Sequence, residues 1–328
     1  MTDSQHVATG RGARQLVGCY LELSKARLAS FVVLTAVVGY LLGAHGEARL
    51  SGLAWIAVGT ALSAFGANIL NQLLEADRDR LMERTRGRPL PSHRVSRREA
   101  AVWGLASAAA GLTALAAGTN WLTTGLSLFV ILLYVLVYTP LKVRTPFNTA
   151  VGAVCGAVPP MMGWTAGAGR LELGAWILFG ILFFWQVPHF LSLAWLYRTD
   201  YERGGFRMMP SVDRDGDLTG RLAVLYAAAL LPITAALSWT GLSGTVFLVC
   251  SQLLGIGFAI VGWKFLRLRS QTAARRLFLA SIVYLPLLMV LMVGDRNVPP
   301  TPAAHGTQAR VATTAEPPSD VTQTRVKF

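Results

Sequence analysis

Apolar runs long enough to cross a membrane alternate with short basic loops along most of this sequence of 328 residues. A helix needs about 20 mostly apolar residues to span the hydrocarbon core of a bilayer, and windows of that length give about nine candidate spans. The composition agrees, because 53% of the residues are hydrophobic and only 14% are charged. Backbone polar groups in lipid must be paired within helices or closed barrels. We therefore expect an all-α, polytopic membrane protein.

The expected spans follow one another closely and leave no room for a soluble domain. By residue number they are 28–44, 53–74, 100–117, 122–138, 150–168, 175–197, 222–242, 246–265 and 277–293. We expect Pro159 and Pro160 to break the fifth span and Pro188 to kink the sixth. The membrane domain then covers residues 25–294, between an N-terminal tail (1–24) and a C-terminal tail (295–328). The second tail is rich in Pro, Thr and Ala, which predicts disorder.

Basic residues concentrate in every second loop. The positive-inside rule places those loops and the N-terminus in the cytoplasm, and an odd number of spans places the C-terminus outside. The net charge of +13 then reflects topology and contact with anionic membrane lipid, and no nucleic acid partner is expected. The chemically interesting loops share this side, so an active site would open to the cytoplasm. No Arg- and Ser-rich presequence precedes the first span, which favours a bacterial plasma (inner) membrane.

The second span ends in a regular series of oxygen-bearing side chains, in the segment NQLLEADRDRLMERTRGRPLP. Asn71, Glu75 and Asp79 recur every four residues, and on a helix each step of four turns about 40° and rises about 6 Å. They form one ridge, with Arg78 on the same face and Asp77 pointing away. Such oxygens suit Mg2+, or Mn2+ in its place, together with substrate phosphates. The alternative is a charged helix end with acid–arginine pairs, which offers Asn71 no partner.

Two further loops on the same side carry candidate binding groups. WLYRTDYERGGFRMMP places Asp200 between Tyr197 and Tyr201, where a carboxylate would hold a second metal or the other side of one diphosphate. An ordinary polar loop with a Gly-Gly turn is the alternative. YTPLKVRTPFN sets Lys142 and Arg144 between two prolines. These cations either anchor the loop at the membrane surface or face a fixed anion such as a phosphate.

The sixth span contains FFWQVPHF, and a histidine next to a proline inside a span is unusual. Pro188 frees a carbonyl group of the helix. His189 is then either a buried, hydrogen-bonded histidine or a substrate contact such as a haem ligand. The rings of Phe184 and Trp185 either pack against lipid and core, or line an apolar channel in which their faces would stabilise a carbocation.

Together these segments resemble the UbiA-type intramembrane prenyltransferase superfamily, which is related to 4-hydroxybenzoate polyprenyltransferase. That superfamily has nine helices around a central cavity, an NxxxDxxxD motif after the second helix and a second acidic motif after the sixth. The resemblance is closest to its protohaem IX farnesyltransferase (haem O synthase) branch. It rests on the segments DRDRLMERTRGRPLP, YTPLKVRTPFNT, GAVPPMMGW, FFWQVPHFLSLAWLYRTDY and GGFRMMP, and covers residues 25–210, while the helix count extends it to about residue 293.

The resemblance implies an Mg2+-dependent transfer of a farnesyl group from farnesyl diphosphate to a vinyl group of haem b. The product would be haem O, an intermediate in the biosynthesis of haem A, the cofactor of cytochrome oxidase. It implies catalysis and metal binding by Asn71, Glu75, Asp79 and Asp200. It implies substrate binding by cationic and aromatic residues, namely Lys25, Arg27, Arg78, Arg86, Arg88, Lys142, Arg144, Trp185, His189, Tyr197 and Tyr201. The implied partners are farnesyl diphosphate, haem b, membrane lipid and the downstream haem A synthase.

The chain departs from the family pattern at four places. Glu75 stands where Asp is usual and is one methylene longer. Residues 25–27 read Lys-Ala-Arg where Lys-Pro-Arg is usual. The fourth residue after Asp200 is Gly204, so a second DxxxD motif is absent, which fits the haem branch. Arg207 occupies the place of a usual proline, which predicts a less rigid loop.

Two other function classes are open at this point. The acceptor could be an aromatic acid, a quinone precursor or a chlorophyll-type ring, although a small phenolic acceptor gives no use for the histidine of WQVPHF. A transporter also has broken helices and intramembrane charges, but here the charges gather at one interface and not at the midplane of two inverted halves.

Overall fold

The computed structural model describes residues 13–297, and every regular element in that range is helical. In chain order the elements are α1 (Ala13–Leu23), α2 (Ala26–Gly43), α3 (Leu50–Asp79), α4 (Arg97–Gly118), α5 (Trp121–Leu132), η1 (Leu133–Tyr138), α6 (Thr139–Leu141), α7 (Asn148–Ala168), α8 (Leu173–Leu196), α9 (Arg198–Arg203), α10 (Met209–Val212), α11 (Asp217–Trp239), α12 (Thr245–Leu268) and α13 (Gln271–Gly294). The all-α prediction is confirmed. α1 lies within the segment assigned to the N-terminal tail, and the predicted disorder at 298–328 lies outside the described residues.

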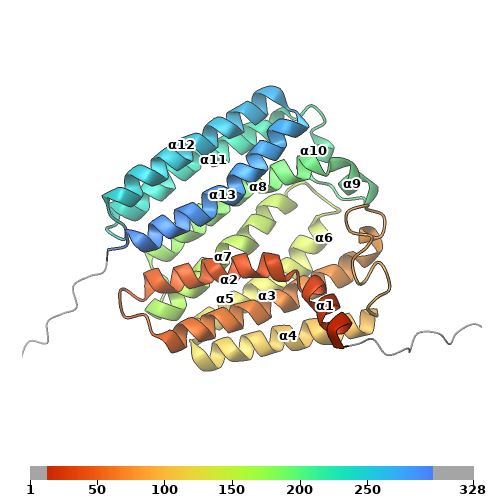
Figure 1. The fold of residues 1–328 in the computed structure, drawn as a ribbon, viewed down its shortest axis with the longest axis horizontal. Helices are drawn as coiled ribbons and strands as arrows, with labels where there is room; N and C mark the ends of the chain where they lie inside the picture. The colour runs from red at the N-terminus through yellow and green to blue at the C-terminus, as the bar shows by residue number, and fades with distance from the viewer. Residues whose placement is uncertain (1–12, 298–328) are drawn as a thin grey trace, which may run out of the picture. The chain divides into compact units, whose positions relative to one another are not determined.

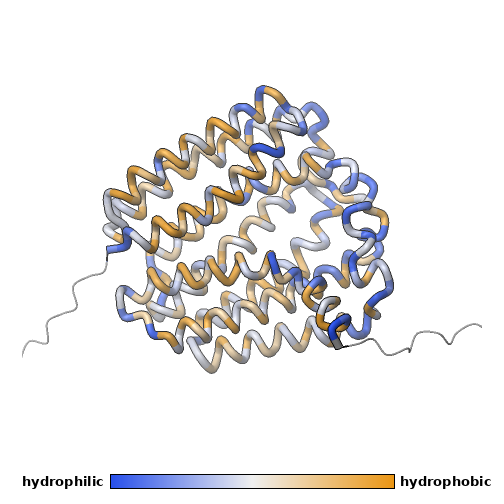
Figure 2. The backbone as a smooth tube through the Cα atoms, in the orientation of Figure 1, coloured by the Kyte–Doolittle hydropathy of each residue, from blue (hydrophilic) through white to orange (hydrophobic). Residues whose placement is uncertain are grey.

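Eight helical segments of the described chain are long and apolar enough to cross a membrane: α2, α3, α4, the continuous α5–η1–α6 element, α8, α11, α12 and α13. The fifth expected span (150–168) corresponds to α7, which is not among the eight because it is rich in glycine and carries two prolines. Most of α7 is buried by other helices, so its surface does not have to be compatible with lipid. Figure 2 shows apolar residues along the helices and hydrophilic ones gathered in the loops at their ends.

The expected break at Pro159 and Pro160 is wrong, because α7 continues through both as one helix. Each proline removes a backbone hydrogen bond, but neighbouring helices compensate for such losses in membrane bundles. α2 covers α7 so closely that a methyl group at Gly163 would collide with the carbonyl oxygen of Ala36, and one at Gly39 with that of Pro160. We call this contact the α2–α7 seam; its closest approaches are at Gly39, Gly43, Gly163 and Gly167. Small residues permit such backbone contact between membrane helices.

Four helices form a closed ring at the centre of the described domain. α2 and α8 each contact both α7 and α13 (Figure 1). The largest hydrophobic cluster joins these four helices to α11 and α12, and it includes Val38 of α2, Trp164 of α7, Leu178 of α8 and Leu285 of α13. α3, α4 and α5 pack outside α2 and α7, while α11 and α12 pack outside α8 and α13. The loops that follow α3, α6 and α8 meet at one end of the bundle, and that end carries the predicted site.

Candidate functional site

The oxygen-bearing series at the end of α3 is buried. Asn71, Glu75 and Asp79 are 0%, 5% and 1% exposed, and we call these three residues the acidic ridge. Asp77 points away as predicted, because its carboxylate is exposed and pairs with Arg97. Arg78 is exposed, and its guanidinium donates to the carbonyl oxygen of Gly204 at 3.1 Å. The helix therefore separates one buried set of oxygens from its exposed charges.

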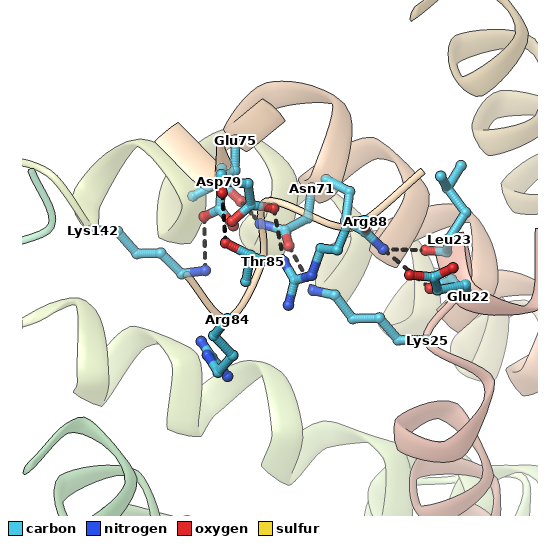
Figure 3. Close-up of polar contacts among 12 residues, drawn as sticks. Glu22, Leu23, Lys25, Asn71, Glu75, Asp79, Arg84, Thr85, Arg88 and Lys142 are labelled. Carbon is cyan, nitrogen blue, oxygen red and sulfur yellow. Dashed lines mark hydrogen bonds and ion pairs between the residues drawn. The ribbon is translucent and has the colours of Figure 1, made fainter. Parts of the chain in front are cut away.

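Each residue of the acidic ridge is bonded to its own cation (Figure 3). The three pairs are Lys25 Nζ to Asn71 Oδ1 (2.9 Å), Lys142 Nζ to Glu75 Oε1 (2.7 Å) and Arg88 Nη1 to Asp79 Oδ2 (2.7 Å). The cations come from three different segments: the α1–α2 turn, the residue after α6, and the α3–α4 loop. Three cations facing two carboxylates and one neutral amide leave an excess of positive charge, which suits an anionic ligand.

Lys25 is placed by a turn that α3 itself holds. The backbone of Lys25 is left-handed, with φ 50°, between α1 and α2. Asn68 Nδ2 donates to the carbonyl oxygen of Ser24 (3.1 Å), and Gln72 Nε2 donates to that of Leu23 (2.5 Å). These two amides were not predicted as site residues, although polar side chains inside an apolar run are a signal that could have identified them.

The orientation of the Asn71 amide is set by η1 and α6. Thr139 Oγ1 donates its only hydrogen to the carbonyl oxygen of Tyr134 (2.8 Å), so it must accept from Asn71 Nδ2 (2.9 Å). Asn71 Oδ1 is then directed toward Lys25 and the Tyr134 hydroxyl (3.5 Å). The π-helical turn of η1 brings these groups together, and such turns are frequent at functional sites. Sequence reasoning missed Thr139 and Tyr134, which resemble ordinary residues at the end of a span.

Two of the lysines differ in how firmly they hold their charge. Burial opposes the charge of Lys142, but Glu75 outweighs that effect and raises the pKa of Lys142 above its ordinary value. The Lys142 ammonium also lies 4.6 Å from the centre of the Tyr138 ring, a favourable cation–π contact. Burial, followed by the nearby charges of Arg88 and Lys142, lowers the pKa of Lys25 to about 7. Of the two lysines, Lys142 is therefore the one that keeps its positive charge more firmly.

Asp200 joins the α3–α4 loop to α9 and does not contact the acidic ridge. Its Oδ2 accepts from the backbone N–H of Arg84 (3.2 Å), and its Oδ1 lies 3.8 Å from Arg203. The Arg84 guanidinium donates to the hydroxyl of Tyr201 (3.2 Å) and lies over the ring of Tyr197 at 4.8 Å. The predicted residues of this loop thus hold the α3–α4 loop in place over the end of α8.

The segment after α9 is tied to Lys142 by a bond that a proline could not make. The backbone N–H of Arg207 donates to the carbonyl oxygen of Lys142 (2.7 Å), and Asn148 Nδ2 donates to that of Arg207 (2.9 Å). Phe206 is buried beside Met82 of the α3–α4 loop. Because proline has no N–H, the arginine at this position adds an anchor between two loops of the site.

The remaining predicted residues lie away from these contacts. Arg27, Arg86 and Arg144 are exposed, and their guanidinium groups have no hydrogen bond or ion pair with other residues in the range 13–297. Trp185 and His189 of α8 face α13: Trp185 Nε1 donates to the Ser281 carbonyl oxygen (2.9 Å), and His189 Nδ1 lies 2.8 Å from Ser281 Oγ. The structure brings together the ridge with Lys25, Arg88 and Lys142, and leaves the other residues around it.

The acidic ridge has a donor set that fits a hard cation. Two carboxylates and one amide oxygen, one per helical turn, are the ligand types that Mg2+ accepts, and each is now bonded to a side-chain cation that a metal could replace. In the part of the chain that the structure describes, no three His, Cys, Asp or Glu side chains gather closely enough to hold a metal. Metal binding by Asn71, Glu75, Asp79 and Asp200 therefore stays a prediction.

Known proteins resemble this chain in sequence and in fold. Residues 32–285 match the model of the UbiA prenyltransferase family. A protein named protoheme IX farnesyltransferase from Solibacter usitatus is 40% identical over 286 residues, 84% of this chain and 98% of that protein. A solved digeranylgeranylglyceryl phosphate synthase has a TM-score of 0.73 at 15% identity (86% of this chain, 98% of that one). A UbiA homolog from Archaeoglobus fulgidus bound to GPP and Mg2+ has a TM-score of 0.60 at 16% identity (84% and 99%).

Proposed function

This chain belongs to the UbiA prenyltransferase family, in its protohaem IX farnesyltransferase branch, and we propose on that premise that it transfers a farnesyl group from farnesyl diphosphate to a vinyl group of protohaem IX (haem b). The products would be haem O and diphosphate. The observation that carries this proposal is 40% identity across nearly the whole length of a relative that bears this name. The buried, cation-lined acidic ridge is the feature that such a reaction requires.

The acidic ridge would bind Mg2+, or Mn2+ in its place, through Asn71, Glu75 and Asp79. A bound ion would supply positive charge that neutralises part of the charge of the diphosphate. Support comes from the homolog of Archaeoglobus fulgidus, which binds Mg2+ together with GPP. Asp200 would join this set only if the loop that it holds through the backbone N–H of Arg84 brought it to the acidic ridge.

We propose that Lys25, Arg88 and Lys142 exchange partners when substrate binds. Each is now bonded to one ridge residue. With the ridge oxygens on the metal, each would turn to a diphosphate oxygen. This exchange would leave no buried charge unpaired, which is the arrangement that costs most. The exposed arginines around the ridge, namely Arg78, Arg86 and Arg144, would add to the positive field. Their joint effect is to stabilise the leaving group, and no nucleophilic side chain is needed.

The chemical steps then follow from bond making and breaking in the substrates. The C1–O bond of farnesyl diphosphate breaks and its electron pair leaves with the diphosphate. The vinyl group of the haem donates its π electrons to C1, and water adds to the resulting cation with loss of a proton, which gives the hydroxyethylfarnesyl chain. Apolar residues of the helix ring would keep water away from the allylic cation before it is captured.

The acidic-ridge end would face the cytoplasm of a bacterial plasma membrane. Basic residues gather in the loops of this end, as the positive-inside rule requires of cytoplasmic loops. The N-terminus would then be cytoplasmic and the C-terminus extracytoplasmic. Haem O would leave the protein as the substrate of the downstream haem A synthase.

The test uses membranes of a host that lacks haem O, with and without this chain. Haem b, farnesyl diphosphate and Mg2+ should give haem O, detected by mass, in the presence of the wild-type chain. Asp79→Ala should lower the rate on the order of 100-fold, whereas Asp77→Ala, an exposed carboxylate on the same helix, should keep it. A wild-type rate in Asp79→Ala would refute the role of the ridge. Prenylation of 4-hydroxybenzoate in place of haem b would refute the acceptor.

A further inference from the structure

His189 is fixed by contacts on three sides. Its ring stacks on Trp185 (centroids 5.2 Å apart, interplanar angle 22°) and on Phe278 of α13 (5.0 Å, 29°). Its Nδ1 atom lies 2.8 Å from Ser281 Oγ, and Trp185 is itself bonded to the Ser281 carbonyl oxygen. The imidazole therefore occupies an aromatic slot between α8 and α13, two helices that lie side by side (Figure 1).

The hydrogen bonds of Ser281 determine which ring nitrogen carries the proton. Ser281 Oγ donates its only hydrogen to the carbonyl oxygen of Phe278 at 2.6 Å, so toward His189 it must accept. The hydrogen of the neutral imidazole then lies on Nδ1, and Nε2 keeps a free lone pair. Nε2 has no hydrogen-bond partner among the described residues. This is the tautomer in which histidines bind metals, with Nδ1–H held by a neighbouring oxygen.

The position of His189 around α8 directs it toward the interior of the helix ring. Successive residues are about 100° apart on a helix. His189 is thus about 40° from Trp185, which bonds to α13, and about 60° from Gln186, whose amide donates to Ala153 of α7 (3.4 Å). The sector between α13 and α7 faces α2, the fourth member of the ring.

The same face of α8 becomes less buried toward the acidic-ridge end. Leu178 and Leu182 on this face are 1% and 3% exposed, whereas His189, Leu193 and Leu196 are partly exposed. His189 lies seven residues before the end of α8, about 10 Å, and Asn71 lies eight residues before the end of α3, about 12 Å. The two side chains therefore lie at similar depths below the ends of their helices.

We propose that His189 Nε2 binds the iron of protohaem IX as an axial ligand and thereby holds the acceptor porphyrin in the helix ring. The inference rests on the proposed function, whose substrate it positions. The two ring nitrogens then have different partners: Nδ1 bonds to Ser281, and Nε2 binds the iron of the substrate. Both sequence-based alternatives, the hydrogen-bonded histidine and the haem ligand, then apply to one side chain. Trp185 and Phe278 keep the imidazole plane fixed, so the ligand is oriented before the porphyrin arrives.

Binding of ferric protohaem IX to the purified full-length chain in nanodiscs, without farnesyl diphosphate, tests the inference. The wild-type chain should give the absorption spectrum of a nitrogen-ligated haem. His189→Ala should lose that spectrum and bind haem at least about tenfold more weakly, since even outer-shell partners of a metal ligand contribute that much. Added imidazole should restore the spectrum. Metal-free protoporphyrin IX should bind equally to both chains, because His189 contacts only the iron.

Matched variants separate ligation from folding. His93→Ala, which changes an exposed histidine bonded to Arg80, should behave as wild type. Ser281→Ala should weaken haem binding less than His189→Ala does. If His189→Ala does not fold, His189→Met retains a possible iron ligand and should give a thioether-ligated spectrum. An unchanged spectrum and affinity in a folded His189→Ala chain, or an equal loss of metal-free porphyrin, would overturn the inference.

The same experiment distinguishes this inference from the proposed function. A chain that binds haem through His189 but forms no haem O in the presence of farnesyl diphosphate would refute the function and leave the ligand assignment intact. A His189→Ala chain that forms haem O with an unchanged KM for haem would refute the ligand assignment and leave the function intact.

Discussion

The two ends of α7 both lie near charged clusters, but only one of the clusters is buried. At the start of α7 are the acidic ridge and its cations. At its other end, about 30 Å away along its 21 residues, Glu172 accepts hydrogen bonds from Trp164 Nε1 (3.1 Å) and Arg170 Nε (2.6 Å). The ring of His45 lies 3.2 Å from the same carboxylate. Glu172 thereby ties the α2–α3 loop to the α7–α8 loop.

Burial is the difference that matters between these two clusters. The side chains of Asp79 and Glu75 are 2% and 6% exposed, whereas that of Glu172 is 24% exposed and Arg170 is 76% exposed. Burying an ion pair costs desolvation energy that the attraction often fails to recover, whereas an exposed pair costs little and contributes little. We infer that the buried pairs serve to bind a ligand, and that the pairs of Glu172 serve to hold the α2–α3 and α7–α8 loops together.

The largest effect should come from removing one charge of a buried pair. Glu75→Gln leaves Lys142 buried without its counter-charge, and the free energy of unfolding should fall by about 3 kcal/mol. The rate of haem O formation should fall on the order of 100-fold, because a site that stabilises the leaving group is lost. Thermal unfolding in detergent and mass analysis of haem measure the two effects. Asp77→Asn, whose pair with Arg97 is exposed, should change stability by less than about 1 kcal/mol; equal losses in both variants would contradict the comparison.

A double variant should separate stability from activity at the acidic-ridge end. Glu75→Gln combined with Lys142→Met replaces the ion pair by neutral side chains, which is often neutral for stability. Stability should recover to within about 1 kcal/mol of wild type, while the rate stays low. A double-mutant cycle on both quantities provides the measurement. If the rate recovers together with stability, the pair is structural and resembles the Glu172 cluster.

The smallest effect is expected at Glu172. Glu172→Gln should lower the free energy of unfolding by about 1–2 kcal/mol through weaker hydrogen bonds, with no change in the rate of haem O formation. A reduced rate in a fully folded variant would show that the two ends are coupled.

The pH dependence of stability should also change in that variant. Burial raises the pKa of Glu172, but the hydrogen bonds from Arg170, His45 and Trp164 outweigh it and leave the pKa below its ordinary value of 4.5. A lowered pKa in the folded state contributes stability above the unfolded value, and this stability is lost as the pH falls through the folded value. When the pH is lowered below 4.5, the melting temperature of Glu172→Gln should therefore decrease less than that of the wild type.

The membrane helices could be predicted because each needs about 20 apolar residues, and that signal is local. α3 continues to Asp79, five residues beyond the predicted end at 74, because its last turns are buried by other parts of the protein and not by lipid. The break at Pro159 was predicted from proline alone, and the sequence around it does not reveal that α2 packs against this part of α7. Local patterns describe a helix, but tertiary packing decides whether it tolerates proline.

The acidic ridge could also be predicted, since three oxygens at a spacing of four must share one helix face. The pairing of each cation with its oxygen could not be predicted from the sequence. Lys25 lies 46 residues from Asn71, and Lys142 lies 67 residues from Glu75. Thr139 was missed for the same reason, because it lies 68 residues from Asn71, whose amide it orients. The sequence named Asp200 as a candidate ligand, but its bond to the Arg84 backbone depends on the path of the α3–α4 loop.

The α2–α7 seam fixes the position of α2 along α7. Backbone meets backbone at Gly39 and Gly163 with no side chain between them, so α2 cannot slide along α7 by even one residue without a collision. α2 begins next to Lys25, at the acidic ridge, and ends next to His45, at Glu172. One register therefore sets the depth of both clusters, and a single methyl group added at Gly39 or Gly163 would displace the charged residues at both ends of α2.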